Sequence, residues 1–188
     1  MKRRNFLKNV SLAGIGLTSF KLFGQAENNI DRYITNRPNI NDRTYISSAV
    51  EEAIKFIKSE ISDPQLSWIF ENCYPNTLDT TVDYEVIDGK PDTFIITGDI
   101  DAMWLRDSTA QVWPYLPLVK KDKKIKNLIK GLINRQAKCV IRDPYANSFY
   151  KDLTKVSAHN KDIPTPMAGV HEQKWEVDSL CYVIRLSY

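Results

Sequence analysis

Residues 123–142, KKIKNLIKGLINRQAKCVIR, carry the clearest structural signal in the sequence. Apolar residues recur there every three or four positions, which places them on one face of an α-helix. The residues of this face are Ile125, Leu128, Ile129, Leu132, Ile133 and Val140. The stretch therefore predicts a long amphipathic helix packed on a core, and it favours a mainly α-helical fold.

Four other segments of the chain show the same helical period. After a cap region at 41–44, the apolar residues from Ile46 to Ile61 predict a helix, which leaves Glu51 on its solvent face. Asp63-Pro64 then starts a second helix, with an N-cap followed by proline at the first helical position. Further helices are predicted over 105–116, where prolines end the pattern, and over 175–188.

Two regions of the chain lack the helical period. Residues 82–98, VDYEVIDGKPDTFIITG, predict two short strands around the turn signal Asp88-Gly89. Residues 143–173 contain three prolines and no periodicity, so they predict a long loop. Because long ordered loops in compact domains are commonly functional, this one is a candidate to border a site.

The start of the chain, MKRRNFLKNVSLAGIGLTSFKLFGQAENN, has the three parts of an export signal. Arg3-Arg4 and the residues after them are typical of the twin-arginine (Tat) signal, an address that the Tat export machinery recognises. The apolar run at 10–20 is too short to span a bilayer, and small residues precede a predicted cleavage site after Ala26. The sequence thus predicts a signal peptide over 1–26, a mature domain over 27–188, no stable membrane span, and a periplasmic or secreted protein.

The charge of the predicted mature domain argues against nucleic acid as a partner. The whole chain has 26 basic and 23 acidic residues, and the signal peptide holds five of the basic ones and none of the acidic ones. Removing it leaves 21 against 23, a net charge of −2, with no overall basic surface. The one cationic run, KKDKKIKN at 120–127, begins the long helix and is interpreted as a solvated face.

Cysteine and histidine content gives no metal-site pattern. The three cysteines, Cys73, Cys139 and Cys181, do not have the spacing of metal ligands. Their odd number does not fit a disulfide framework, although a single disulfide between two of them is an open alternative. His159 and His171 are the only histidines. The sequence therefore predicts neither a bound metal nor another cofactor.

Residues 98–115, GDIDAMWLRDSTAQVWPY, combine groups that suit a sugar. Arg106 and Asp107 place a planar donor fork beside a two-oxygen acceptor, which matches neighbouring sugar hydroxyls that each donate and accept. Trp104 offers a flat apolar face, and Asp99 and Asp101 add acceptors before the helix. The alternative, an Arg106–Asp107 ion pair or cap above a tryptophan-rich core, remains equally open.

Two motifs resemble those of glycoside hydrolase family 125, the bacterial and fungal exo-α-1,6-mannosidases. TGDIDAMWLRDSTAQVWPYLPL at 97–118 is similar to the most distinctive motif of that family, and HEQKWEVDSLCYVIRLSY at 171–188 is similar to the next one. The resemblance covers essentially the whole mature chain. It implies the N-terminal part of an (α/α)6 barrel with a small β-hairpin, incomplete at its C-terminus, around a pocket for one terminal sugar.

The resemblance also implies roles for residues. Arg106 and Asp107 would hold hydroxyls of a terminal mannose from an α-mannoside oligosaccharide, and the remaining candidates for the sugar site are Asp178, Asp101, Asp99, Trp104 and Glu176. Glu176 is equally well explained as a charge or cap at a helix start. The family is inverting and metal-independent.

No catalytic residue is assigned within this chain. The family's acid and base lie in later motifs that have no counterpart here, and Asp107 is a poor acid because the adjacent guanidinium favours its charged form. The expectation is therefore an inactive, truncated part of a mannosidase. A non-catalytic carbohydrate-binding fragment is the alternative, as is a glucoamylase-like glycosidase, because Trp-Leu-Arg-Asp at 104–107 also resembles that group.

The last residues, CYVIRLSY, continue a helical pattern without a capping signal. The expectation is that the architecture continues past Tyr188 and that apolar residues such as Ile184 and Leu186 are exposed in this chain.

Overall fold

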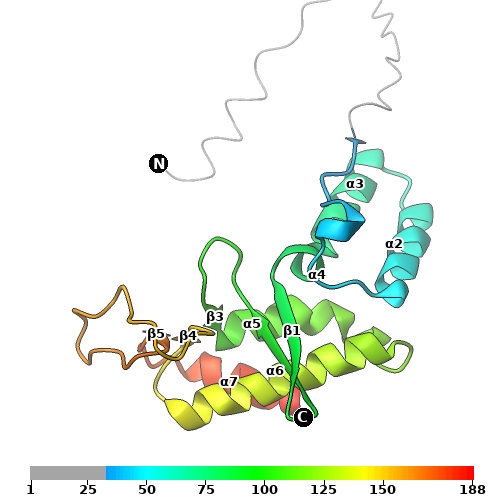
Figure 1. Cartoon of the computed structure of the whole chain (residues 1–188). Helices are drawn as coiled ribbons and strands as arrows, with labels where there is room; N and C mark the ends of the chain where they lie inside the picture. The colour runs from blue at the N-terminus through cyan, green and yellow to red at the C-terminus, as the bar shows by residue number, and fades with distance from the viewer. Residues whose placement is uncertain (1–32) are drawn as a thin grey trace, which may run out of the picture. The chain divides into compact units, whose positions relative to one another are not determined.

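The computed structural model describes residues 33–188 (Figure 1). The predicted signal peptide, with its arginine pair and cleavage site, lies outside the described residues. Over 33–188 the fold is mainly helical, and no helix there has the length and apolar character needed to cross a membrane. The helices are α2 (Ser48–Glu60), α3 (Pro64–Cys73), α4 (Asn76–Thr80), α5 (Leu105–Val112), α6 (Lys123–Arg142) and α7 (Val177–Ser187), with 3-10 turns η2 (Ile40–Asp42) and η3 (Trp113–Leu118).

A β-hairpin packs across helix α6 (Figure 1). The strands β1 (Val82–Ile87) and β2 (Lys90–Ile95) pair antiparallel, and β2 packs along α6. The two meet at Gly131, where a Cβ would collide with the Thr93 hydroxyl and lie 3.0 Å from the backbone of Asp92. Thr93 Oγ1 donates to the Leu128 carbonyl at 3.0 Å, so a buried hydrogen bond also joins strand to helix.

The sequence predictions for α6 and the hairpin are confirmed. Helix α6 has the predicted ends, and its apolar face is buried, with Ile125, Leu128 and Leu132 fully inaccessible. The hairpin turns at Asp88 and Gly89, both with positive φ (50° and 74°), as a two-residue primed turn requires. The predicted periods therefore correspond to real packing faces.

The first helices follow the prediction except at one cap. Asp63 caps α3 by accepting from the amides of Gln65 and Leu66, as the Asp-Pro signal predicts. Helix α2 begins later than predicted, because Ser47 supplies its N-cap by accepting from the Val50 amide at 3.2 Å. The predicted cap region at 41–44 instead overlaps the end of the 3-10 turn η2.

A cluster of four charged residues ties the segment before α2 to α2 and α4. Arg37 donates to Asp79 (Nε to Oδ2, 2.7 Å) and to Glu51 (Nη2 to Oε1, 2.6 Å), and Arg43 adds a second bond to Glu51 at 3.1 Å. The Arg37 side chain is only 5% exposed and that of Asp79 only 3%. Glu51, expected on the solvent face of its helix, is partly exposed (32%), and its carboxylate is also a partner in this cluster.

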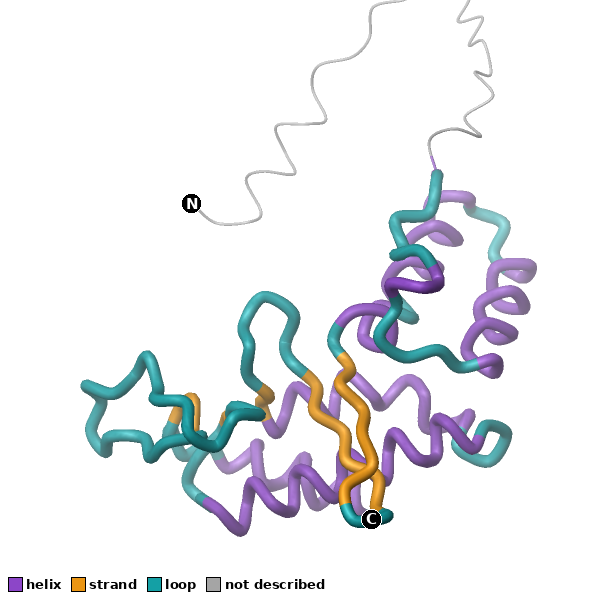
Figure 2. The backbone as a smooth tube through the Cα atoms, in the orientation of Figure 1, coloured by secondary structure: helices purple, strands orange, loops and turns teal. Residues whose placement is uncertain are grey.

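The region predicted as a long loop contains two strands. β4 (Ser148–Phe149) pairs antiparallel with β3 (Met103–Trp104) on one side and β5 (Val170–Glu172) on the other. Figure 2 shows β4 and β5 separated by a long loop segment. Strands of two or three residues are too short to show the alternation that sequence reasoning relies on. This small sheet attaches the loop to the segment before α5.

Helices α5 and α7 pack against each other, and α7 also contacts α6. Helix α5 ends at Val112, two residues before Pro114, and continues as the 3-10 turn η3 through both predicted breakers. In α7, Ile184 is 68% exposed as expected, but Leu186 is 7% exposed. The expectation for Leu186 is wrong because this residue belongs to the buried apolar core.

Candidate functional site

The start of α5 is held by a buried glutamine from the middle of α6. Gln136 is fully buried, and its Nε2 donates to the Leu105 carbonyl (3.1 Å) and to the hydroxyls of Ser108 and Thr109 (2.9 Å each). Trp104, just before the helix, has an extended backbone (φ −84°, ψ 141°) because it belongs to β3. The side chains of the first helical turn are therefore presented from a rigid strand-to-helix junction.

Arg106 brings together three carboxylates from two helices. Its Nη1 donates to Asp178 Oδ2 at 2.9 Å and to Glu176 Oε2 at 3.4 Å, both at the start of α7. The Arg106 Nε lies 3.4 Å from Asp107 Oδ2, without hydrogen-bond geometry, and that oxygen is shielded from solvent and accepts no hydrogen bond within the described chain. The Arg106 side chain is 37% exposed, and those of its three partners between 35% and 46%. The group is therefore open to solvent.

The electrostatics of this group follow from the ion pair between Arg106 and Asp178. Their hydrogen bond lowers the pKa of Asp178 and raises the pKa of Arg106, so both are charged at neutral pH. Glu176 occupies the N-cap position of α7, but its side chain does not cap the helix. It accepts from Ser179 Oγ at 3.1 Å instead. Four of the seven sequence candidates are thus in one cluster: Arg106, Asp107, Glu176 and Asp178.

A second cluster lies against Trp104 and links it to the long loop. The rings of Trp104 and His171 are 4.8 Å apart, and Tyr150 and His159 meet the same imidazole edge-on at 5.0 and 5.1 Å. Ser148 Oγ lies 3.0 Å from His171 Nδ1, and burial lowers the pKa of this histidine. The Trp104 ring is therefore packed on one side, which fixes its orientation.

Within residues 33–188, Asp99 and Asp101 form no hydrogen bond or ion pair with the Arg106 cluster. Both are exposed, in the turn before β3. Asp101 pairs with Lys155 of the long loop at 2.8 Å, and the same ammonium lies 4.2 Å from the centre of the Tyr150 ring. Asp101 thus fastens the loop rather than extending the group around Arg106.

Sequence reasoning missed Gln136 and the surroundings of His171. Gln136 had a visible signal, because it is a polar residue within the apolar stripe that runs from Ile129 through Leu132 to Cys139. His171 had none, since it meets Ser148 and Tyr150 through the pairing of β5 with β4, which the sequence did not reveal, and His159 lies in the loop between these strands.

The cysteines and the remaining acidic groups give no metal centre in the part of the chain that the structure describes. Within residues 33–188 no three His, Cys, Asp or Glu side chains are arranged to hold a metal ion. Cys73, Cys139 and Cys181 are all free thiols, and Cys139 is buried against the core.

Comparison with known proteins assigns the chain to a family. Residues 63–188 match glycoside hydrolase family 125, described as metal-independent α-mannosidases. A curated relative, the meiotically up-regulated gene 157 protein of Schizosaccharomyces pombe, is 43% identical over 160 residues, which cover 81% of this chain and 31% of the relative.

A solved structure is similar as well. It is a metal-independent α-mannosidase of Streptococcus pneumoniae in a non-productive complex with α-1,6-mannobiose, with 41% identity and a TM-score of 0.66. The match covers 77% of this chain and 34% of that one, so the chain spans about a third of the length of the relatives it matches. On the extent of the family match, this chain belongs to glycoside hydrolase family 125.

Proposed function

We propose that the protein takes part in the hydrolysis of α-mannosides and that the residues around Arg106 hold a terminal mannose. The observation that carries this is a partly exposed guanidinium among three partly exposed carboxylates, from two helices that are packed together. Each sugar hydroxyl both donates and accepts a hydrogen bond. Two adjacent hydroxyls can therefore bond to the guanidinium and to a carboxylate in place of the ion pairs between them. Trp104, two residues before Arg106 in the sequence, offers an apolar ring.

The finer assignment is an inverting exo-α-1,6-mannosidase built on an (α/α)6 barrel. The family match supports the glycosidase chemistry, and the mannobiose bound to the Streptococcus pneumoniae relative supports the linkage. An exo-acting enzyme needs a site that ends at the terminal ring, and the Arg106 cluster, with charged groups on both sides of the guanidinium, suits such an end. Asp99 and Asp101 are proposed to border the site through the loop.

The role proposed for the cluster is binding rather than proton transfer. Inversion requires a protonated acid and a separate carboxylate base about 6.5–9.5 Å apart. Asp178 is a poor acid because its pKa is lowered by Arg106, and Asp107 and Glu176 lie beside the same guanidinium. We therefore infer that the acid and base belong to sequence that the longer relatives contain and these 188 residues do not.

Calorimetric titration of this chain with α-1,6-mannobiose and with the α-1,6-linked glucose disaccharide tests the proposal, together with an assay for released mannose. We expect binding of the mannoside, weaker binding of the glucoside and no release of mannose. A preference for the glucoside would favour the glucoamylase-like alternative. Release of mannose would contradict the inference about acid and base, and binding of neither sugar would overturn the sugar site.

Export through the twin-arginine pathway to the periplasm or beyond is proposed from the sequence alone. Arg3 and Arg4, the short apolar run after them and the small residues before Glu27 support it. Replacing both arginines with lysine should retain the protein in the cytoplasm of the expressing cell. Unchanged recovery of the processed protein outside the cytoplasm would contradict this.

A further inference from the structure

Asn147, the residue before β4, joins the start of α5 to the segment that leads into α7. It is 1% exposed, and both its backbone and its side chain form hydrogen bonds. Its carbonyl accepts from the Leu105 amide at 3.1 Å, and its own amide donates to the Glu172 carbonyl at 3.2 Å. Its side chain donates from Nδ2 to Glu172 Oε2 at 2.8 Å and accepts at Oδ1 from the Lys174 amide at 3.0 Å. One buried residue therefore bonds to two segments that are far apart in the sequence.

These bonds lie next to both halves of the Arg106 cluster. Leu105 is the first residue of α5 and directly precedes Arg106, and its amide belongs to the first turn, where a helix supplies no partner of its own. The N-cap residue of α5 makes no side-chain cap within the described chain. Lys174 lies two residues before Glu176, in the irregular segment between β5 and α7. Asn147 thus fixes the chain just before Arg106 and just before the carboxylates that Arg106 contacts.

The bodies and the starts of these two helices are held by different contacts. Along their length α5 and α7 pack directly, and Thr109 Oγ1 donates to the Tyr182 carbonyl at 3.4 Å. At their starts, Arg106 Nη1 reaches Asp178 at 2.9 Å and Glu176 at 3.4 Å. A displacement of either start by about 1 Å would take both contacts beyond hydrogen-bond distance. The residue that fixes the starts therefore controls the spacing of the cluster.

The side chain of Asn147 suits both of its neighbours. A carboxylate only accepts and a backbone N–H only donates, so this position needs a donor and an acceptor side by side, which a side-chain amide supplies. Although burial raises the pKa of Glu172, hydrogen bonds from Lys174 and Asn147 lower it below its ordinary value, so this carboxylate is charged at neutral pH. Aspartate at position 147 would set a second carboxylate against it, and leucine would leave both bonds unmade.

We propose that Asn147 is a positioning residue for the sugar site: it holds Glu176 and Asp178 where Arg106 can reach them. This rests on the function proposed for the Arg106 cluster. The four hydrogen bonds of Asn147 go to residues that precede those of the cluster in the sequence. Its effect on mannoside binding is therefore indirect, through the spacing between the guanidinium and the carboxylates that two adjacent hydroxyls must match.

Asn147→Leu tests the proposal without a change in charge. We expect the titration midpoint of Asp178, followed by the NMR shift of its carboxyl carbon, to rise toward its ordinary value of 3.8, because the hydrogen bond to Arg106 that lowers it is weakened. Affinity for α-1,6-mannobiose, measured by calorimetry, should fall at least about tenfold.

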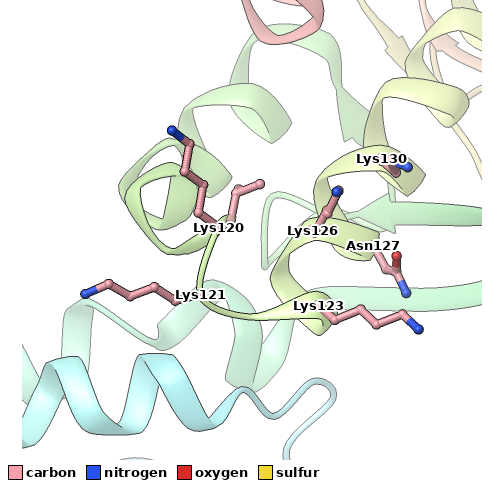
Figure 3. A pocket seen from close by; sticks show the side chains of 7 residues that line it. Lys120, Lys121, Lys123, Lys126, Asn127 and Lys130 are labelled. Atoms are coloured by element: carbon pink, nitrogen blue, oxygen red, sulfur yellow. The ribbon is translucent and has the colours of Figure 1, made fainter.

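Two asparagines of α6 provide matched controls with the same substitution. Asn134 donates from Nδ2 to the Pro91 carbonyl at 2.8 Å, so Asn134→Leu loses a hydrogen bond at the hairpin. Asn127 lies among lysines whose side chains extend apart at the start of the helix (Figure 3). Neither control should change the Asp178 midpoint or the affinity for mannobiose, even if Asn134→Leu lowers the melting temperature.

A second pair of variants separates the hydrogen bond from a general loosening of the fold. Asn147→Asp sets two carboxylates against each other. Combining it with Glu172→Gln restores the bond with donor and acceptor exchanged and keeps the net charge of the unchanged chain. We expect Asn147→Asp to lose affinity for mannobiose and the double variant to regain most of it. This comparison decides the matter even if Asn147→Leu does not fold.

Three results would overturn the proposal: an unchanged midpoint and affinity in folded Asn147→Leu, equal losses in a control, or a double variant no better than Asn147→Asp. The Asp178 midpoint is measured without sugar, so it distinguishes failure of this proposal from failure of the sugar site. If the unchanged chain binds no mannobiose while the midpoint shifts as expected, the sugar site is wrong and the positioning of Asp178 by Asn147 stands.

Discussion

Two arginines in this molecule are each surrounded by carboxylates, and they differ in exposure. The Arg37 side chain is 5% exposed and its partner Asp79 3%, whereas the Arg106 side chain is 37% exposed and its partner Asp178 46%. Both clusters join segments far apart in the sequence. Arg37 connects the chain before α2 to α4, and Arg106 connects α5 to α7.

The comparison shows that exposure, rather than residue type, separates a structural cluster from a candidate site. Around Arg37 the guanidinium and the Asp79 carboxylate have lost nearly all of their water, although Glu51 is 32% exposed, so removal of Arg37 leaves a buried carboxylate uncompensated. Around Arg106 water reaches the same kinds of group, so ion pairs there contribute little to stability and a ligand can replace them at small cost. The first cluster should therefore govern folding and the second binding.

The largest effect is expected from Arg37→Met. The substitution leaves Asp79 and Glu51 without their main partner, and breaking a buried ion pair in this way costs about 3–5 kcal/mol. Urea denaturation followed by circular dichroism measures the loss. Lys55→Met, on the exposed side of α2, is the control and should change the free energy of unfolding little. A loss no larger for Arg37→Met than for the control would show that burial does not distinguish the two clusters.

Substitutions in the Arg106 cluster should weaken sugar binding and leave stability nearly unchanged. Arg106→Lys keeps the charge but loses the planar fork, and Asp107→Asn loses a charged acceptor. A hydrogen bond to a charged group contributes about 1.5–3 kcal/mol, so each change should weaken binding of α-1,6-mannobiose by about tenfold to a hundredfold. Unfolding free energy should move by less than about 1 kcal/mol because the ion pairs are exposed.

The control for these two variants is Glu52→Gln, since Glu52 is exposed whereas Glu51 belongs to the Arg37 cluster. Calorimetry and urea denaturation are run on the same preparations. If both substitutions preserve mannobiose affinity while stability falls, the Arg106 cluster is structural like that of Arg37.

An intermediate effect is expected from Gln136→Leu. Leucine fills similar space and removes the donor shared by the Leu105 carbonyl and the hydroxyls of Ser108 and Thr109, but these hydroxyls still donate to that carbonyl. Leucine also removes Gln136 Oε1, a buried atom that accepts no hydrogen bond within the described chain, so the free energy of unfolding should fall by only about 0.5–1.5 kcal/mol, the net value of a hydrogen bond. Mannobiose affinity should fall too, because the first turn of α5 loses its support. Ala137→Gln, on the exposed side of the same helix, is the control. Unchanged stability and affinity would show that Gln136 does not support the first turn of α5 or the sugar site.

Much of the fold is predictable from local sequence because local signals determine it. The ends of α6, the hairpin turn at Asp88-Gly89 and the start of α3 at Asp63-Pro64 each rest on a period or a turn signal within a few residues. The sheet of β3, β4 and β5 was not predictable, since its strands are short and their pairing is between distant segments.

The candidate site, too, is predictable only in the part that local sequence determines. Residue types alone mark Arg106 and Asp107 as candidates, but the pairing of Arg106 with Asp178, 72 residues later, depends on how α5 and α7 pack. The same reasoning grouped Asp101 with them, although its ion pair with Lys155 takes it to the loop. Periodicity predicts faces, and only the fold decides which faces meet.

The smallest effect compares how the two clusters respond to acid. Hydrogen bonding to Arg106 holds the pKa of Asp178 below its ordinary value of 3.8, and hydrogen bonding to Arg37 holds that of Glu51 below 4.5. A lowered pKa in the folded state contributes stability above the unfolded value, and this is lost as the pH falls through the folded value. Both contributions are therefore complete at neutral pH and disappear only below about pH 4.

The two clusters should differ in whether the fold is lost when their carboxylates are protonated. We expect Asp178, followed by the NMR shift of its carboxyl carbon, to titrate with a midpoint below 3.8 while the fold stays intact, because its pair is exposed. Protonation of Glu51 should coincide with loss of α2 signals, because its partner Arg37 is buried. In Arg106→Leu the midpoint of Asp178 should return to about 3.8 with the Glu51 titration unchanged. A midpoint for Asp178 at or above 3.8 in the unchanged chain would mean that its pair with Arg106 does not persist in solution, so that the two arginine clusters differ in the presence of an ion pair and not only in its exposure.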